Sequence, residues 1–333
     1  MNTTAKFLLI RFSSIGDIVL TSPVIRCMKQ QIDDAEIHFL TKPQFASIVS
    51  NNPYITKVHT LKENFQETID ELKDECFDYI IDLHHSLRSS RVVSRLGLGA
   101  FKFKKLNIEK WLYVNFKINR LPDIHIVDRY MNTVSMFDVK NDGKGLDYFI
   151  PDKDEVQLKI ISENIFPKKF IALVVGAKHF TKQMPTDKII EICKLLEAPV
   201  LLLGGKEDFS KGEEIIANSG KSDIINICGK FSLNQSASII KQAGVIITPD
   251  TGLMHIAAAF HKKIISVWGN TVPEFGMYPY MPGKGSEIIE IKNLKCRPCT
   301  KIGFRICPNR HFLCMRQIDE NKIAQLTHNL IHS

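Results

Sequence analysis

The stretch from Val245 to Phe260 carries the residue types that bind phosphate. Its first residues, Val245–Thr248, form a β-branched run typical of a buried parallel strand, and Pro249 cannot continue the hydrogen-bond ladder. The run Leu253–Phe260 predicts a helix packed on the sheet. A strand that leads through a tight loop into a helix presents free N–H groups and the positive end of the helix dipole. The stretch therefore predicts a phosphate or diphosphate site.

The loop between that strand and that helix adds polar groups. Asp250 and Thr251 are good helix caps, and Gly252 lets a ligand approach the backbone closely. His255 follows within the first turn and adds a second polar side chain at the rim where Asp250 lies. Taken alone, Pro-Asp-Thr-Gly is equally consistent with a capped turn that binds nothing, so the rest of the chain must decide.

Four cysteines near the C-terminus form a second candidate site. They have the spacing C-x2-C-x7-C-x6-C, which by itself would suggest structural zinc. They are Cys296, Cys299, Cys307 and Cys314. Zinc, reduced thiols and disulfides are all compatible with this spacing, and we expect the cluster to support local folding and not catalysis. The other four cysteines lie in apolar contexts and are expected in the core: Cys27, Cys76, Cys193 and Cys228.

Length and composition predict two globular domains in the cytoplasm. A chain of 333 residues exceeds the ~250–300 residues at which single cores stop growing. Its net charge of +8 fits an acidic partner such as a nucleotide, a phosphorylated glycolipid or an anionic membrane, and does not single out nucleic acid. No stretch reaches the ~18 apolar residues of a membrane span, and Phe7–Ile10 is too short for a signal-peptide core. We expect a cytoplasmic monomer with reduced thiols.

Strands and helices alternate in the N-terminal half. Strands are expected at Lys6–Phe12, Glu36–Leu40, Lys57–Leu61 and Asp78–Leu83. Helices are expected between the first loop and Gln31, at Phe65–Glu75 and at His125–Val139. Alternation of this kind is typical of a doubly wound parallel sheet.

A second alternating series follows a candidate linker at Asp138–Lys169, within which a helix is expected at about Lys153–Asn164. Its strands are expected at Phe170–Val175, Val200–Leu203, Ile224–Ile227, Val245–Thr248, Ile264–Trp268 and Glu287–Ile291, with a last helix at Ile318–Leu330. The fold class is therefore α/β. We expect two Rossmann-like domains, 1–160 and 168–333, facing each other across a cleft.

These motifs resemble those of the heptosyltransferases, glycosyltransferase family 9. The string Asp250–His255 (DTGLMH), followed by a small-residue helix, is similar to the family's C-terminal signature, and Ser13–Asp17 (SSIGD) is similar to its N-terminal loop. The resemblance covers nearly the whole chain and implies the GT-B fold and an inverting transferase that needs no metal cofactor. The implied donor is ADP-heptose, bound by the C-terminal domain. The implied acceptor is the lipopolysaccharide (lipid A-core) inner core, met by the N-terminal domain at the cytoplasmic face of the inner membrane.

On the acceptor side, the resemblance makes Asp17 the general base. A carboxylate can take the proton of the acceptor hydroxyl as that oxygen attacks the anomeric carbon. The implied acceptor contacts are Ser14, Gly16, His85 and Arg88. Arg88 would face the anionic inner-core sugar, because a guanidinium binds phosphate or carboxylate in a bidentate manner. Family members often carry Gln-Gly where His84 and His85 stand, which leaves the acceptor's identity open.

On the donor side, the loop Gly176–Pro185 resembles the family's Lys-x-Trp-Pro loop, with Met184 in place of tryptophan. Lys182 then matches the lysine expected on the donor's phosphates, where a cation stabilises the leaving group without a metal. Glu207 matches the acidic residue expected on the ribose, and Asp208 is the alternative. The other implied donor contacts are Lys178, Phe231, Asp250, Thr251, Gly252, Leu253 and His255, with Ser232 as the cap of the helix after Phe231.

The segment Phe101–Arg120 interleaves aromatic and basic residues. These are Phe101, Phe103, Trp111, Tyr113 and Phe116 with Lys102, Lys104, Lys105, Lys110, Lys117 and Arg120. The pattern is compatible with a membrane-surface patch or an acceptor-binding segment. It is equally compatible with a basic face over ordinary core aromatics.

Two other functions explain parts of the sequence. A sugar-nucleotide epimerase can share the layout of two Rossmann-like domains, but the Ser13–Asp17 loop argues against it. A zinc-ribbon nucleic-acid binder would explain the cysteines and the positive charge, yet it accounts for only about 20 residues. We therefore predict a glycosyltransferase without a nucleic-acid partner.

Overall fold

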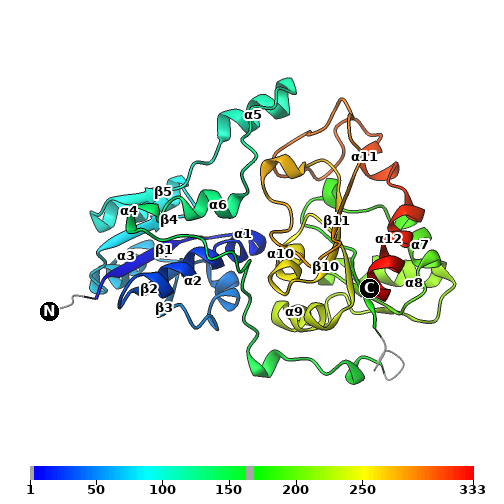
Figure 1. Cartoon of the computed structure of the whole chain (residues 1–333), viewed down its shortest axis with the longest axis horizontal. Coiled ribbons are helices and arrows are strands. Elements are labelled where there is room, and N and C mark those ends of the chain that lie inside the picture. Colours follow the sequence, from blue (N-terminus) through cyan, green and yellow to red (C-terminus); the bar gives the residue numbers. More distant parts are fainter. Residues whose placement is uncertain (1–3, 163–168) are drawn as a thin grey trace. The chain divides into compact units, whose positions relative to one another are not determined.

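The computed structural model describes residues 4–162 and 169–333, and contacts divide the chain into two units. The first unit contains Met1–Lys105 and Ile124–Phe149, and the second contains Leu106–Asp123 and Ile150–Ser333. Each unit holds one parallel sheet with helices on its faces (Figure 1). The predicted α/β class with two parallel sheets is confirmed.

The first unit has a five-stranded parallel sheet of order β3-β2-β1-β4-β5. The strands are β1 (Lys6–Ile10), β2 (Glu36–Thr41), β3 (Lys57–Thr60), β4 (Tyr79–Asp82) and β5 (Ala100–Lys102). The helices are α1 (Ile15–Val19), α2 (Ser22–Gln31), α3 (Phe65–Asp74), α4 (Leu87–Leu96) and α6 (Ile126–Met131). Ile69 and Leu72 of α3 and Val92 of α4 pack on the strand core that includes Leu8 and Ile80.

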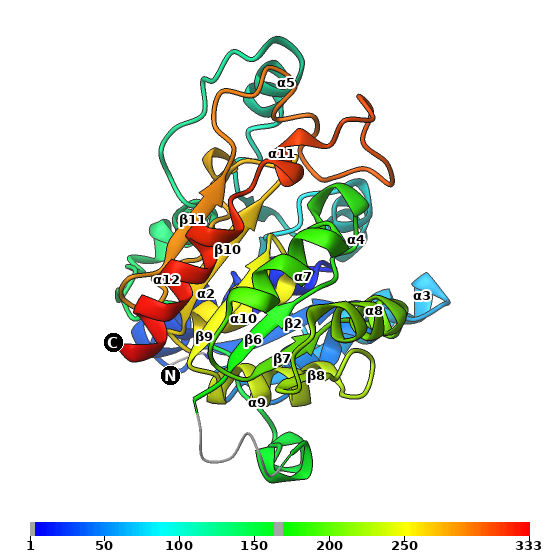
Figure 2. The same cartoon turned by 90° about the vertical axis from the view of Figure 1, so that its right-hand side faces the viewer.

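The second unit has a six-stranded parallel sheet of order β11-β10-β9-β6-β7-β8. The strands are β6 (Ile171–Val174), β7 (Val200–Leu203), β8 (Ile224–Asn226), β9 (Val245–Pro249), β10 (Lys263–Trp268) and β11 (Glu287–Glu290). The helices are α5 (Asn107–Phe116), α7 (Thr186–Leu195), α8 (Phe209–Ser219), α9 (Leu233–Gln242), α10 (Gly252–Ala259), α11 (Leu313–Arg316) and α12 (Glu320–His332). Helices α7, α8 and α12 lie together on one face of this sheet, and α9 and α10 on the other (Figure 2).

Short 3₁₀ helices occupy several loops. They are η1 (Pro43–Ile48), η2 (Ser135–Phe137), η3 (Asp152–Asp154), η4 (Leu158–Ile160), η5 (Phe180–Lys182), η6 (Lys206–Asp208) and η7 (Pro273–Phe275). Among the described residues, no helix is long and apolar enough to cross a membrane.

The strand order explains which loops meet. In the first unit β1 lies between β2 and β4, and its last residue, Ile10, pairs with both Leu40 and Asp82. The loops that follow β1 and β4 therefore leave the same edge of the sheet. In the second unit β6 lies between β7 and β9, so the loops after β6 and β9 share an edge in the same way. Ligands of doubly wound sheets bind at such points, where the strand order reverses.

The helix predicted at Lys153–Asn164 is wrong over its described part, and its last two residues lie outside the described residues. Hydrogen bonds to α9 hold this segment in another conformation. The Val156 amide donates to Ser238 Oγ at 2.9 Å, and the Ser238 hydroxyl donates to Glu155 at 2.7 Å. Long-range pairing thus overrides a local preference for helix.

Other elements also differ from expectation. The helix expected at His125–Val139 ends at Met131, and η2 follows it. Strand β5 and helix α5 were not predicted, and Cys76 is exposed and outside the core.

Residues 106–123 group with the second unit, whereas the predicted boundary placed them in a domain of residues 1–160. The Tyr113 ring lies edge-on to Phe275 with centroids 6.1 Å apart, and the Lys110 ammonium lies 5.7 Å from the centre of the same ring. The Lys117 ammonium also donates to the Pro298 carbonyl at 2.8 Å. Phe275 and Pro298 belong to the second unit, so these contacts attach α5 to that unit.

Candidate active site

The carboxylate of Asp17 is held in place by the start of α1. Its Oδ2 accepts hydrogen bonds from the Ser14 amide at 3.1 Å and from the Ser14 hydroxyl at 2.7 Å. Gly16 lies between them and is buried in the first turn. The predicted orientation of Asp17 by this loop's N–H and hydroxyl groups is therefore present in the structure for Ser14.

Arg11 is the partner of Asp17 that the sequence reasoning missed. Its Nη2 lies 2.5 Å from Asp17 Oδ1, its Nε donates to the Ser13 carbonyl at 2.8 Å, and its Nη1 donates to the Leu83 carbonyl. Burial alone would lower the pKa of Arg11, but Asp17 together with Tyr130 and Asp82 more than offsets this and raises the pKa. The guanidinium is therefore permanently charged and fixes the direction of the Asp17 carboxylate. The sequence did contain a signal for this role, because Arg11 is a cation that directly follows the apolar strand β1.

His84 lies in the loop after β4 and interacts electrostatically with both Arg11 and Asp17. Burial, with Arg11 and Lys105, lowers the pKa of His84 to about 4, so the ring is neutral at physiological pH. Its Nδ1 has no hydrogen-bond partner within the described part of the chain. The buried Asp82 carboxylate fixes this loop by accepting the amide of His84 at 3.0 Å.

The other predicted acceptor residues lie at the start of α4. Asp82 also accepts the His85 amide at 2.7 Å and the Ser89 hydroxyl at 2.7 Å, so one buried carboxylate shapes the turn into this helix. His85 has a positive φ of 47° and its Nδ1 lies 3.2 Å from the Phe103 carbonyl oxygen. His85 and Arg88 are both exposed.

In the second unit, Lys182 and Asp250 form an ion pair between the loops that follow β6 and β9. Lys182 Nζ lies 2.5 Å from Asp250 Oδ2, and the Thr271 hydroxyl donates to the same oxygen at 2.9 Å. Asp250 was expected to act as a helix cap, and that expectation is wrong. Thr251 is the residue before α10, and its hydroxyl lies 3.2 Å from that of Thr248. The Asp250 carboxylate instead orients the Lys182 ammonium.

The start of α10 supplies donor groups beside this ion pair in the chain. Gly252 and Leu253 are its first residues, and the first N–H groups of a helix have no partner within it. His255 was expected at the rim, but its side chain is only 2% exposed. Lys178 is exposed, and burial together with Lys182 and Lys178 lowers the pKa of His179.

Glu207 and Asp208 have different environments, which separates the two candidates for the ribose. Asp208 is buried and its Oδ2 accepts the Gly205 amide at 2.8 Å. A Cβ added at Gly176 would lie 1.9 Å from that same oxygen, so Asp208 fills the space that this glycine leaves. Burial raises the pKa of Asp208. Glu207 is exposed and is the better placed of the two for a ligand.

Phe231 is half-buried directly before α9, whose expected cap is confirmed. Ser232 Oγ accepts the Gln235 amide at 3.2 Å. Asn270 is a residue near Asp250 in contacts that the sequence did not reveal. Its neighbour Thr271 binds Asp250, its side chain is 1% exposed, and neither amide atom has a hydrogen-bond partner among the described residues.

The model of glycosyltransferase family 9 (heptosyltransferase) matches residues 66–306, which is more than half of the chain. The chain belongs to this family. Membership decides against the epimerase and against the zinc-ribbon nucleic-acid binder as readings of the sequence.

Relatives of this family 9 protein are similar to it, in sequence or in structure, over most of its length. Lipopolysaccharide heptosyltransferase 1 of Campylobacter coli is 28% identical over 290 residues, which cover 80% of this chain and 84% of that protein. The structure of an ADP-heptose lps heptosyltransferase II from E. coli has a TM-score of 0.75 at 18% identity and covers 98% of both chains. A glycosyl transferase family 9 structure from Veillonella parvula has a TM-score of 0.79 at 18% identity, covering 99% of this chain and 98% of that one. These likenesses confirm the predicted GT-B fold.

In this family 9 chain, the cysteine-rich loop 296–314 braces the loops that carry Lys182 and Thr271. The Phe304 amide donates to the Thr181 hydroxyl at 2.8 Å, and the Thr181 amide donates to the Phe304 carbonyl at 3.2 Å. The Cys299 amide donates to the Asn270 carbonyl at 3.2 Å. The loop therefore contacts the residues directly before Lys182 and Thr271, the two partners of the Asp250 carboxylate.

The four cysteines of this loop are free thiols in the structure. Burial raises the pKa of Cys299 to about 12 and that of Cys314 to about 11, so both are protonated. Among the described residues, the sets of three or more ligand atoms lying within 4.8 Å of one another do not include these sulfur atoms. A structural role without catalysis stays a prediction for them.

Arg297 fastens the same loop to the end of the sheet. Its guanidinium pairs with Glu290 at 2.7 Å and donates to the carbonyls of Gly269 at 2.5 Å, Ile291 at 3.0 Å and Thr271 at 2.8 Å. Both charged side chains are at most 10% exposed.

We expect Arg297→Ala to lower the free energy of unfolding by about 3–5 kcal/mol, because it leaves Glu290 as a buried, unpaired charge. Urea unfolding followed by circular dichroism measures this change. Lys295→Ala, at an exposed position directly before this loop, is the matched control and should stay within about 0.5 kcal/mol of the wild type. Equal stability of both variants would show that Arg297 does not hold the loop.

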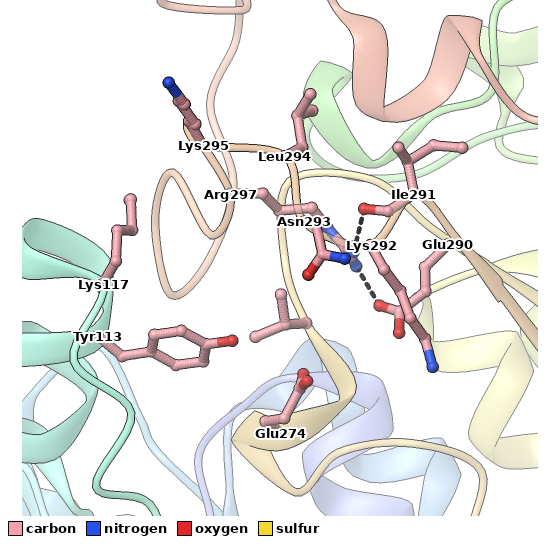
Figure 3. Close-up of a pocket in the computed structure, with 11 residues that line it drawn as sticks. Tyr113, Lys117, Glu274, Glu290, Ile291, Lys292, Asn293, Leu294, Lys295 and Arg297 are labelled. Carbon is pink, nitrogen blue, oxygen red and sulfur yellow. Dashed lines mark hydrogen bonds and ion pairs between the residues drawn. The ribbon is translucent and has the colours of Figure 1, made fainter.

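A separate pocket of about 430 Å³ lies between α5 and the segment after β11 (Figure 3). Tyr113 of α5 and Lys117, which directly follows α5, line it on one side, and Lys292, Asn293 and Lys295 line it on the other. Tyr113 and Lys117 belong to the aromatic and basic segment Phe101–Arg120, whereas none of the predicted catalytic and donor-binding residues lines this pocket.

Proposed function

We propose that this protein transfers a heptose from ADP-heptose to a lipopolysaccharide inner-core acceptor, with inversion at the anomeric carbon and with no metal. The observation that carries the proposal is the Lys182–Asp250 ion pair directly before the start of α10. It combines a cation and a helix N-terminus, which suits a diphosphate leaving group. Donor and acceptor are taken from the names of the relatives, an ADP-heptose lps heptosyltransferase and a lipopolysaccharide heptosyltransferase.

The donor side works by charge. The diphosphate gains negative charge as its bond to the anomeric carbon breaks, and the Lys182 ammonium with the first N–H groups of α10 stabilises that charge. Asp250 keeps the ammonium in place before the donor arrives. Because Lys182 supplies the positive charge, the proposal needs no metal. Glu207 would accept the ribose hydroxyls, and Phe231 would lie against the adenine.

The acceptor side works by proton transfer. The acceptor oxygen attacks the anomeric carbon from the side opposite the diphosphate, and its proton moves to the Asp17 carboxylate. Ser14 and Arg11 hold that carboxylate in one orientation through both oxygen atoms. A single displacement of this kind inverts the anomeric configuration, and ADP leaves with the electron pair of the broken bond.

Purified protein with ADP-heptose and deep-rough lipopolysaccharide tests the proposal. We expect the acceptor to gain the mass of one heptose, one ADP to be released per transfer, and NMR of the product to show the opposite anomeric configuration. Chelator should leave the rate unchanged. Retained configuration, or loss of activity on chelation that zinc or magnesium restores while the folded fraction stays unchanged, would contradict the mechanism.

We also propose that α5 lies on the membrane that carries the acceptor. This helix buries none of its residues, and Ile108, Trp111 and Phe116 are 72%, 55% and 59% exposed. The basic residues Lys117 and Arg120 follow them and are exposed. Apolar side chains flanked by cations are typical of helices that lie in the interface of an anionic bilayer.

We expect Ile108→Ser combined with Trp111→Ser to weaken binding to anionic vesicles by about 10-fold, because two large side chains no longer leave water. Co-sedimentation with phosphatidylglycerol vesicles measures it. The control is Ile160→Ser, which removes an exposed isoleucine, 74% accessible, from another surface and should bind like the wild type. If the double variant also binds like the wild type, α5 is not the membrane contact.

A further inference from the structure

A pair of buried histidines lies in the first unit, apart from the groups around Asp17. His38 is in β2 and His59 is in β3, and they are 2% and 1% exposed. Leu40 pairs with His59 in the strand register, so His38, two residues earlier in β2, points to the same face of the sheet. Glu75 directly follows α3, which covers that face.

The ligand atoms of these three residues converge on one point. His38 Nδ1 lies 2.9 Å from His59 Nε2. Glu75 Oε2 lies 3.8 Å from His38 Nδ1, and Glu75 Oε1 lies 4.0 Å from His59 Nε2. A tetrahedral ion with bonds of about 2.0–2.1 Å separates its ligand atoms by roughly 3.3 Å. One ligand atom from each residue lies within 4.8 Å of the other two, so side-chain movements of about 1.5 Å at most would bring the three atoms to that spacing.

Each histidine also has a carboxylate beside its other ring nitrogen. His59 Nδ1 lies 2.7 Å from Glu71 Oε1, and His38 Nε2 lies 3.8 Å from Glu36 Oε2. Histidines that bind metals nearly always donate their second N–H to a carboxylate or carbonyl, which fixes the tautomer. Glu71 does this for His59, and Glu36 is within a small side-chain movement of doing it for His38.

Without an ion, this arrangement leaves one polar atom unsatisfied. If His59 donates to Glu71, its Nε2 must accept the proton of His38 Nδ1, and His38 Nε2 is then a bare acceptor. That atom is buried and has no hydrogen-bond partner among the residues that the structure describes. A bound ion removes the problem, because it replaces the shared proton and His38 takes its N–H at Nε2, facing Glu36.

We propose that His38, His59 and Glu75 bind one divalent transition-metal ion, for which zinc is the best match. Two imidazoles and one carboxylate are a usual zinc ligand set, and water fills the fourth position. Binding moves the proton of His38 from Nδ1 to Nε2 and releases no net proton from the two rings. Lys57 pairs with Glu75 Oε1 at 2.5 Å and leaves Oε2 toward His38.

The ion would act on the fold. Strand β3 is the edge of its sheet, and the site ties it to β2 and to the end of α3. This role is independent of the proposed sugar transfer, so either can fail without the other.

Hydrogen exchange on the full-length, metal-stripped protein tests the site. Zinc alone is the probe, added to about 100 times its dissociation constant, and the backbone amides of Lys57–Thr60 should then exchange about 100-fold more slowly. Glu75→Gln removes a ligand oxygen and keeps the shape, and we expect it to lose that slowing. Glu197→Gln, in an exposed group with His328 and His332, is the control and should behave like the wild type.

A second measurement distinguishes metal bound at this site from metal bound by the cysteines. Cobalt(II) in place of zinc gives thiolate charge-transfer bands if sulfur binds it, and only weaker ligand-field bands with nitrogen and oxygen ligands. We expect a component without thiolate bands that disappears in Glu75→Gln. Unchanged exchange in β3, equal slowing in Glu75→Gln, or cobalt spectra with thiolate bands alone would each overturn the proposal.

Discussion

Asp17→Asn should leave donor affinity near that of the wild type and reduce sugar transfer by roughly 10²–10⁴-fold, the usual worth of a general base. Asparagine keeps the shape of aspartate but cannot take the acceptor's proton. Donor affinity should survive because the donor groups, Lys182 and the start of α10, lie in the other unit. Transfer assayed with saturating ADP-heptose, and ADP binding by calorimetry, measure the two effects separately.

The contacts of Asp17 indicate that Asp17→Asn also affects stability. Asp17 contacts Arg11 through one oxygen and two donor groups of Ser14 through the other, so an amide NH₂ must face either the cation or the two donors. We expect some loss of thermal stability, because a buried guanidinium loses its charge partner. A lower transfer rate therefore counts only when it is expressed per folded molecule.

Asp250→Asn is the matched variant for the other carboxylate. If Asp17→Asn transfers sugar at the wild-type rate while Asp250→Asn binds donor normally and fails to turn over, the two roles must be exchanged. His84 is the remaining candidate base near Asp17, since its low pKa keeps it neutral at physiological pH. His84→Gln should retain most activity if Asp17 is the base.

Lys182→Ala should raise the activation free energy by roughly 2–4 kcal/mol, which lowers kcat by about 30- to 1000-fold. The leaving diphosphate gains charge in the transition state, so a cation at this position acts on kcat more than on donor binding. Steady-state kinetics with varied ADP-heptose separates kcat from KM. An unchanged kcat with a raised KM would contradict the leaving-group role.

The ion pair with Asp250 complicates that single variant and also supplies its control. Without Lys182, the Asp250 carboxylate has lost its cation and would repel the diphosphate, so KM should rise as well. The double variant Lys182→Ala with Asp250→Asn removes this repulsion. We expect it to recover donor affinity and not kcat. Lys178→Ala, at an exposed position in the same loop, should change kcat much less.

Much of this molecule follows from local sequence. Strand β7 has its predicted bounds, Val200–Leu203, because apolar β-branched and leucine residues flanked by breakers mark a buried strand. The cap at Ser232 and the strand–loop–helix unit around Asp250 also depend on contacts between near neighbours. The family resemblance rests on the same short strings, which is why it could be recognised without a structure.

Tertiary structure decided which charged side chains meet. Lys182 and Asp250 are far apart in the sequence and pair because β6 and β9 are neighbours in the sheet. Arg11 bonds to Leu83 because β1 and β4 are neighbours, and no local pattern gives that strand order. The same reason accounts for α5, which joins the second unit through Phe275, and for His38 and His59, brought together by the pairing of β2 and β3. Local sequence sets where strands and helices form, whereas the pairing of charges depends on free energies between distant loops that only the folded chain brings into contact.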